Sequence, residues 1–353
     1  MLDKKLVQFL CKKTKYKEIG EERLLHDFPL FGEMVGEAIN TRNLLSVSIN
    51  LSDLLENMDL YKACLISNFI GFACEKEENT AAGKEIIKLF SKACNLVYEM
   101  MRENEVEGEC EIPSDFSKIY KRNKDWVRAY YGFERICISA MSFLTRDVEL
   151  RLLLREMGME EKIRYLAEET PNTPYLHSIY YVGRMLDTCA NLKLLVLDPE
   201  KQQGFFAVAN DMDNCFHLIF LLEEQIAKKV GEKYGMDHFN VEETVVQLGH
   251  GVMVENLEEI EDDSYHTHFL EYNYGAILEQ EDIPYLIWGE MPPEAIPSID
   301  DYGIIVLKKA ENYRRFDIRF LASYHTVLKP AVEIERELTK EEYEMWIGRI
   351  KKE

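Results

Sequence analysis

YGIIVL, residues 302–307, is the stretch that predicts a β-sheet in a chain whose pattern is otherwise mostly helical. Consecutive aliphatic, largely β-branched side chains of this kind are typical of a buried strand. FDIRFL, residues 316–321, alternates apolar and polar side chains, which is the pattern of a half-buried strand. Two shorter β-prone runs occupy residues 244–248 and 251–254, and the prolines of MPP at 291–293 require a loop. The sequence therefore predicts a small antiparallel sheet near the C-terminus.

The end of the chain predicts a helix that closes this sheet. Thr339 and Glu342 have the capping-box spacing, in which the hydroxyl bonds forward to the first turn and the carboxylate reaches back to the cap. Tyr343, Trp346 and Ile350 then recur on one face of an amphipathic helix.

The N-terminal part of the chain has the periodicity of helices. Apolar side chains recur three and four positions apart, for example at Ile86, Phe90, Cys94 and Val97. The run Asp198-Pro199-Glu200 has the composition of a helix start. We expect antiparallel helix pairs joined by short loops, and a solenoid-like stack is one arrangement of such pairs. The predicted fold is α+β, with a helical domain at 1–232 and an acidic α+β domain at 233–353.

The acidic residues are concentrated in one part of the chain. The formal net charge is −22, and the 74 residues between Lys233 and Lys308 contain no Lys or Arg but 17 Asp and Glu. The same window contains many aromatic residues, which is unlike a disordered acidic tail. A folded acidic surface repels nucleic acid and anionic membranes and attracts basic proteins. We therefore expect a basic protein partner, without direct binding to nucleic acid or membrane, although acidity also serves solubility alone.

The leading prediction for function is a non-catalytic binding protein that presents this acidic surface to a basic protein. An adaptor, or an immunity or antitoxin protein, would act in this way, and none of these functions requires a cofactor. Aromatic side chains within an acidic surface would serve as anchors. The predicted contact residues are Glu258, Glu259, Glu261, Asp262, Asp263, Tyr265, Tyr272 and Trp288.

A metal-dependent hydrolase is an alternative. On a strand, His266 and His268 point to the same face, and Glu271 follows three residues later. Two imidazoles and a carboxylate are ligands for a divalent transition metal, which would polarise a substrate or activate water. Such a histidine pair is also common on exposed strands, and an acidic field favours its protonated form, which binds no metal. A helical scaffold protein without either activity is a further alternative.

Two other clusters have an ordinary structural explanation beside a functional one. Asp213 and His217 are four residues apart, so they would face each other on a helix. Trp126 and Tyr130 lie among basic residues such as Arg128, a mixture that can mark nucleic-acid contact. In an acidic chain, their helical spacing favours core aromatics with a solvated basic face.

Common catalytic and targeting motifs are absent from the sequence. It contains no GxxxxGK[ST] or GxGxxG phosphate loop, no GxSxG elbow and no HExxH zinc motif. None of the eight cysteines forms a CxxC pair, which favours reduced, buried thiols. The N-terminal residues do not have the pattern of a secretory signal, so we expect a cytoplasmic protein.

Overall fold

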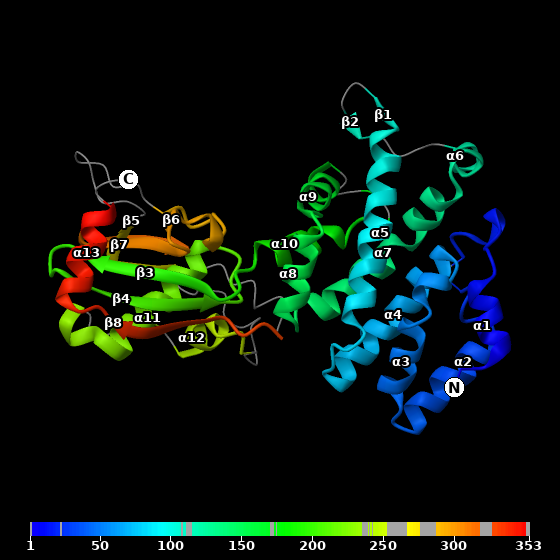
Figure 1. Ribbon diagram of the computed structural model, residues 1–353, viewed down its shortest axis with the longest axis horizontal. Coiled ribbons are helices and arrows are strands. Elements are labelled where there is room, and N and C mark those ends of the chain that lie inside the picture. The colour runs from blue at the N-terminus through cyan, green and yellow to red at the C-terminus, as the bar shows by residue number, and fades with distance from the viewer. Residues whose placement is uncertain are drawn as a thin grey trace. The chain divides into compact units, whose positions relative to one another are not determined.

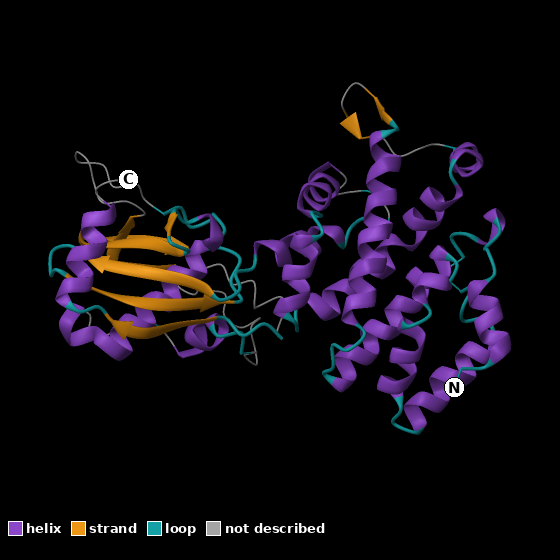
Figure 2. Cartoon of the chain, in the orientation of Figure 1, coloured by secondary structure: helices purple, strands orange, loops and turns teal. Residues whose placement is uncertain are grey.

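The computed structural model describes residues 2–21, 23–106, 109–110, 115–169, 173, 175–234, 239, 241, 243–252, 267–275, 287–317 and 327–350. The chain divides into two compact units, Met1–Leu186 and Asp187–Glu353 (Figure 1). The first is helical and the second is built on a sheet (Figure 2), which confirms the predicted α+β class with a helical N-terminal body. In the part of the chain that is described, no helix has the length and apolarity needed to cross a membrane.

The first unit consists of helices joined by short connections. A two-stranded hairpin follows the fifth of these helices, Gly83–Arg102. The helices are α1 (Lys4–Cys11), α2 (Pro29–Asn40), α3 (Leu44–Ser52), α4 (Leu60–Glu77), α5 (Gly83–Arg102), α6 (Phe116–Arg122), α7 (Lys124–Leu144), α8 (Val148–Glu156), α9 (Glu160–Glu169) and α10 (Ile179–Asp187), and the hairpin is β1 (Glu105–Val106) with β2 (Glu109–Cys110).

Helix α7 is the centre of this unit, because it packs against both α4 and α5. Small side chains allow α7 and α4 to approach closely. A Cβ atom on Gly132 of α7 would lie 2.6 Å from Cys64 Cβ of α4, and one on Gly71 would lie 3.1 Å from the Cα of Ser139. Asn123 begins α7 by accepting a hydrogen bond from Asp125 N at 3.0 Å, as expected of an N-cap.

Two glycines of this unit are expected to respond oppositely to alanine. Gly132→Ala should lower the free energy of unfolding by about 1–3 kcal/mol, since the new methyl group forces two packed helices apart. Gly36→Ala, within α2, meets nothing within 4 Å and should raise it by about 0.5–1 kcal/mol through helix propensity. Urea denaturation of both variants measures the two effects. Destabilisation at Gly36 or tolerance at Gly132 would contradict this account of the packing.

The second unit contains a mixed sheet with the strand order β5-β7-β3-β4-β8, and β6 pairs with β7. Neighbouring strands are antiparallel except β3 and β7, which run parallel, so the predicted antiparallel sheet has one parallel pair. The elements are β3 (Leu192–Asp198), β4 (Gln203–Asn210), α11 (Cys215–Tyr234), α12 (Glu243–Gly249), β5 (Thr267–Gly275), β6 (Ser298–Ile299), β7 (Tyr302–Asp317), β8 (Ala331–Glu337) and α13 (Lys340–Ile350).

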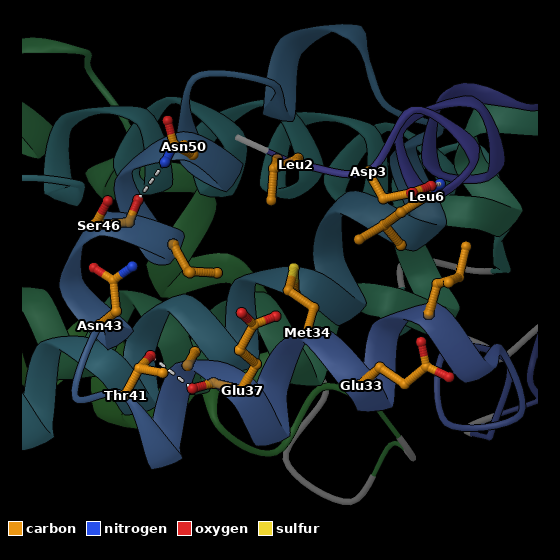
Figure 3. A pocket seen from close by; sticks show the side chains of 13 residues that line it. Leu2, Asp3, Leu6, Glu33, Met34, Glu37, Thr41, Asn43, Ser46 and Asn50 are labelled. Carbon is orange, nitrogen blue, oxygen red and sulfur yellow. Dashed lines mark hydrogen bonds between the residues drawn. The ribbon is translucent and has the colours of Figure 1, made fainter.

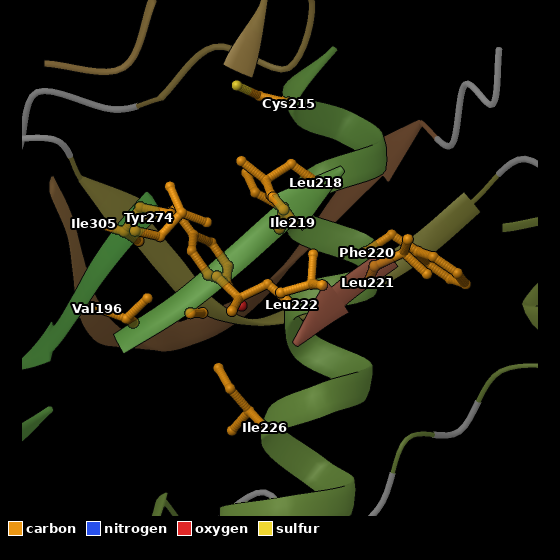
Figure 4. Close-up of a cluster of buried hydrophobic side chains, with 14 of the residues drawn as sticks. Val196, Cys215, Leu218, Ile219, Phe220, Leu221, Leu222, Ile226, Tyr274 and Ile305 are labelled. Carbon is orange, nitrogen blue, oxygen red and sulfur yellow. The ribbon is translucent and has the colours of Figure 1, made fainter. Parts of the chain in front are cut away.

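A helix covers each face of this sheet. Helix α11 packs on one face in a single apolar cluster with inward residues of the strands. Figure 4 shows part of this cluster, including Val196, Leu218, Leu222, Ile226, Tyr274 and Ile305. On the other face, Tyr343, Trp346 and Ile350 of α13 pack against the strands, as their spacing predicted.

The capping box that begins α13 is confirmed. Glu342 N donates to Thr339 Oγ1 at 3.2 Å, and Thr339 N donates to Glu342 Oε2 at 2.9 Å. Arg336 also donates two hydrogen bonds of 2.8 Å to the Glu342 carboxylate, one to each oxygen. These contacts hold the pKa of Glu342 near 2, with the Arg336 bonds as the largest cause.

Three local predictions are corrected. The units divide at 186/187 instead of 232/233, because β3, β4 and α11 belong to the sheet unit. Asp198-Pro199-Glu200 ends β3 and enters the turn of the β3–β4 hairpin instead of starting a helix, since Leu192–Asp198 pair with residues 203–209. Residues 244–248 lie in helix α12 instead of a strand. The predicted strand at 316–321 is β7 up to Asp317, and its remainder lies outside the described residues.

Candidate functional site

The segment Ile287–Met291 is attached by its backbone to the start of α11. Cys215 N donates to Met291 O at 3.0 Å, and Phe216 N donates to Gly289 O at 2.9 Å. Ile287 N donates to Tyr274 O of β5 at 3.0 Å. The first N–H groups of a helix have no partner within the helix, so this segment supplies the acceptors that the start of α11 requires.

Gly289 permits this close approach. A Cβ atom at position 289 would lie 2.4 Å from ring atoms of Phe216, which is far inside van der Waals contact. Ile287 is buried and belongs to the apolar cluster under α11. The backbone on both sides of Trp288 is therefore fixed by hydrogen bonds, through Ile287 to β5 and through Gly289 to α11.

The side chain of Trp288 points into solvent and is 68% exposed, whereas Trp126 and Trp346 are 7% and 5% exposed. Single exposed apolar side chains are common on protein surfaces, so the exposure of Trp288 gains weight only from its fixed backbone and its acidic surroundings. Tryptophan is also among the residues most enriched at the energetic centres of protein interfaces.

Exposed carboxylates follow Trp288 in the chain, and no basic residue intervenes. Glu290, Glu294, Asp300 and Asp301 are exposed. Asp300 and Asp301 have φ values of 49° and 64° and form the turn between β6 and β7, where short acidic side chains are well tolerated. Asp300 is paired with Arg349 of α13, so its charge is partly neutralised.

The structure describes only part of the predicted contact set. Glu258, Glu259, Glu261, Asp262, Asp263 and Tyr265 lie outside the described residues. Tyr272 lies on β5 with its backbone in register with Lys309 of β7. Trp288 is the member whose side chain is described.

The predicted metal ligands are also described only in part. His266 lies outside the described residues, while His268 and Glu271 lie on β5, whose pairing with β7 shifts register between Leu270 and Tyr272. Among the described side chains, no group of three or more His, Cys, Asp and Glu is placed to hold a metal ion. The metal-dependent hydrolase stays a prediction from the sequence.

A buried polar cluster on α11 was not predicted. Glu223, Glu224 and His217 are fully buried. Tyr274 Oη donates to Glu223 Oε1 at 2.8 Å, and the ring Nε2 of His217 lies 2.6 Å from Gly249 O at the end of α12. The signal in the sequence was the adjacent pair of glutamates within an otherwise apolar helical run.

His217 has a structural contact in place of the predicted pairing with Asp213. Its Nε2 donates to the Gly249 carbonyl, while Asp213 Oδ1 accepts a 2.7 Å hydrogen bond from Asn214 Nδ2. Burial lowers the pKa of His217 to about 4; the Gly249 hydrogen bond opposes this shift and His250 adds to it. The imidazole is therefore neutral at pH 7.

A second acidic surface lies in the first unit. A groove of about 410 Å³ runs between α1, α2 and α3, with Glu33 and Glu37 one helical turn apart along one side (Figure 3). No Lys, Arg or His lines it. The lining residues are Leu2, Asp3, Leu6, Leu30, Glu33, Met34, Glu37, Ala38, Thr41, Asn43, Ser46, Val47 and Asn50.

Comparison with protein-family models, with curated proteins and with solved structures finds no match to this chain.

Proposed function

We propose that this chain is a non-catalytic binding protein whose C-terminal unit captures a basic segment of a partner protein, with Trp288 as the anchor. The observation that supports this function is an exposed tryptophan, on a backbone hydrogen-bonded to α11, within 74 residues that contain no Lys or Arg. An adaptor and an immunity or antitoxin protein are the two forms that this function takes.

The charge distribution favours a basic partner. Residues 187–353 contain 34 Asp and Glu against 16 Lys and Arg, so this unit has a net charge of −18 out of −22 for the chain. A field of this sign steers cationic proteins toward the unit and repels nucleic acid.

The fixed backbone around Trp288 favours tight contact. Side chains and loops that must be ordered on binding reduce affinity, and a segment already bonded to α11 avoids part of that cost. The face of an indole also attracts cations, and a guanidinium both stacks on it and pairs with carboxylates. Arginine next to an apolar residue is therefore the preferred ligand chemistry.

We place this function in the cytoplasm. Among the described side chains, Cys11, Cys64, Cys74, Cys94, Cys137 and Cys215 are free thiols, and all of these are buried except Cys11, which is partly buried. Burial raises the pKa of Cys64 and Cys94 to about 12, so these thiols stay protonated and unreactive. Free thiols of this kind are typical of a reducing compartment.

Selection of a displayed library of random 12-residue peptides on the full-length chain tests this function. Selected peptides should be enriched in Arg and Lys with at least one apolar residue. Their affinity, measured by fluorescence anisotropy, should fall about tenfold or more in Trp288→Ala, as for a central interface residue. Replacing Arg by Gln in the peptide should have a similar effect, and added salt should weaken binding.

Tyr180→Ala is the matched control, because Tyr180 is a 51% exposed aromatic residue on α10 of the other unit. It should leave peptide affinity unchanged. Selected peptides without excess basic residues, or equal loss of affinity in the two variants, would refute the proposed function.

A further inference from the structure

Glu224 of α11 is a fully buried carboxylate with a cation at each oxygen. Lys228 Nζ lies 2.6 Å from Oε1, one helical turn along α11. His250 Nε2 lies 2.7 Å from Oε2 and comes from the residue that follows α12. A buried carboxylate keeps its charge only where partners of this kind compensate for lost hydration.

Both ring nitrogens of His250 face acceptors. Its Nε2 meets Glu224 Oε2, and its Nδ1 lies 3.3 Å from Pro330 O, directly before β8. A neutral imidazole has a single N–H and satisfies only one of two acceptors, whereas the imidazolium donates to both. The geometry is therefore that of a protonated ring.

The groups around His250 shift its pKa in opposite directions. Glu224 favours the imidazolium through its hydrogen bond and its charge, and partial burial and Lys228 oppose it. The balance raises the pKa of His250 above its usual value of 6.5. Nearby on α11, His217 is neutral at pH 7, as described above, and Lys329 beside Pro330 is exposed. On α12 itself, Glu243 is exposed at the opposite end of the helix.

We propose that protonated His250 connects the end of α12 to α11 and to the start of β8 through its two ring N–H groups, an arrangement that we call the latch. We further propose that alkaline pH, which removes one ring proton, opens the latch by releasing the end of α12. Loss of the ring proton removes one of the two N–H donors and leaves Glu224 with Lys228 as its remaining cation. In the sequence, six Asp and Glu follow His250 within residues 255–263. This device does not depend on the proposed partner.

Histidine-ring ¹⁵N NMR of the full-length chain, titrated from pH 5 to 9, tests the latch. The His250 ring, assigned with His250→Gln, should carry both protons at pH 5 and titrate with a midpoint above 6.5. Glu224→Gln should lower that midpoint, and Lys228→Gln should raise it, because Lys228 opposes protonation of His250. The Lys228 side chain is 60% exposed and Glu224 keeps His250 as its partner when Lys228 is replaced, so Lys228→Gln is the milder change and tests the proposal even where Glu224→Gln fails to fold.

Opening is measured by hydrogen exchange of the His250 and Gly251 amides, which donate to carbonyls of the last turn of α12. Their protection factors should fall about tenfold or more above the His250 midpoint, as expected on losing a hydrogen bond donated by a charged group. A His250 midpoint at or below 6.5, a midpoint that does not rise in Lys228→Gln, or protection that stays constant through the titration would overturn the latch.

Discussion

Replacing Arg128 by alanine is expected to lower the free energy of unfolding by about 3–5 kcal/mol, the usual cost of leaving a buried charge without its partner. Arg128 of α7 and Asp59 before α4 are both buried, and Arg128 Nε lies 3.2 Å from Asp59 Oδ2. Thr14 completes the cluster, since its N–H donates to Asp59 Oδ2 at 3.1 Å and its carbonyl accepts from Arg128 at 3.1 Å.

The size of this effect follows from burial. Without Arg128, the Asp59 carboxylate keeps its hydrogen bonds from Thr14 but loses its close ion pair in a site that water does not reach. Three segments distant in sequence meet in this cluster, so the loss is expected to loosen the connection between α1, α4 and α7.

Urea denaturation followed by circular dichroism measures the change, with Lys88→Ala as the control. Lys88 forms a 2.8 Å ion pair with Glu85, but the two side chains are 52% and 36% exposed. An exposed pair of this kind contributes about 0–1 kcal/mol. Similar losses in the two variants would contradict the role assigned to burial.

Acidification from pH 6.5 to pH 4 is expected to remove about 3 kcal/mol of stability through His217 alone. The pKa of His217 is about 4 in the folded chain against an ordinary value of 6.5, so the unfolded chain binds a proton that the folded chain rejects. The contribution is complete above pH 6.5 and is lost as the pH falls toward 4. His250, whose pKa is raised, has the opposite sign and contributes its stability at low pH.

His217→Gln isolates this contribution, because a glutamine amide can still donate to the Gly249 carbonyl but has no proton to gain. The difference in unfolding free energy between the wild type and this variant should change by about 3 kcal/mol between pH 6.5 and 4. Parallel curves for the two proteins would refute the neutral, buried state of His217.

The groove between α1, α2 and α3 and the surface around Trp288 differ in an important respect. Glu33 and Glu37 line an open groove without any feature that selects an occupant. Trp288 has a fixed backbone and an exposed aromatic face, which are the properties that interface anchors share. These properties are the reason that we propose the C-terminal unit as the site of partner binding.

Local pattern was sufficient for several elements. The capping box at Thr339 and Glu342 and the apolar face of Tyr343, Trp346 and Ile350 predicted α13 correctly, because a helix start and an amphipathic face depend on residues within four positions. The aliphatic run at 302–307 predicted part of β7 for a similar reason.

Long-range pairing decided the rest of the sheet unit. Asp198-Pro199-Glu200 has a genuine helix-start composition, but the strands on either side of it pair with each other and bury their side chains in the same core. Residues 244–248 are β-prone and still form α12, where Val245 and Leu248 pack into the cluster around α11. In both cases burial against distant residues outweighs a local preference of a few tenths of a kcal/mol per residue.

The sequence by itself determined the fold class, the acidic C-terminal part and the closing helix, and the role of Trp288 as an aromatic anchor stays a prediction. Only the tertiary structure decided that the sheet unit begins at Asp187, that Arg128 is buried instead of solvated, and that Glu224, Lys228 and His250 meet. Composition and period depend on neighbours in the chain, whereas the contacts of Arg128 with Thr14 and of His250 with Glu224 and Pro330 join residues 26 to 114 positions apart, which no local pattern specifies.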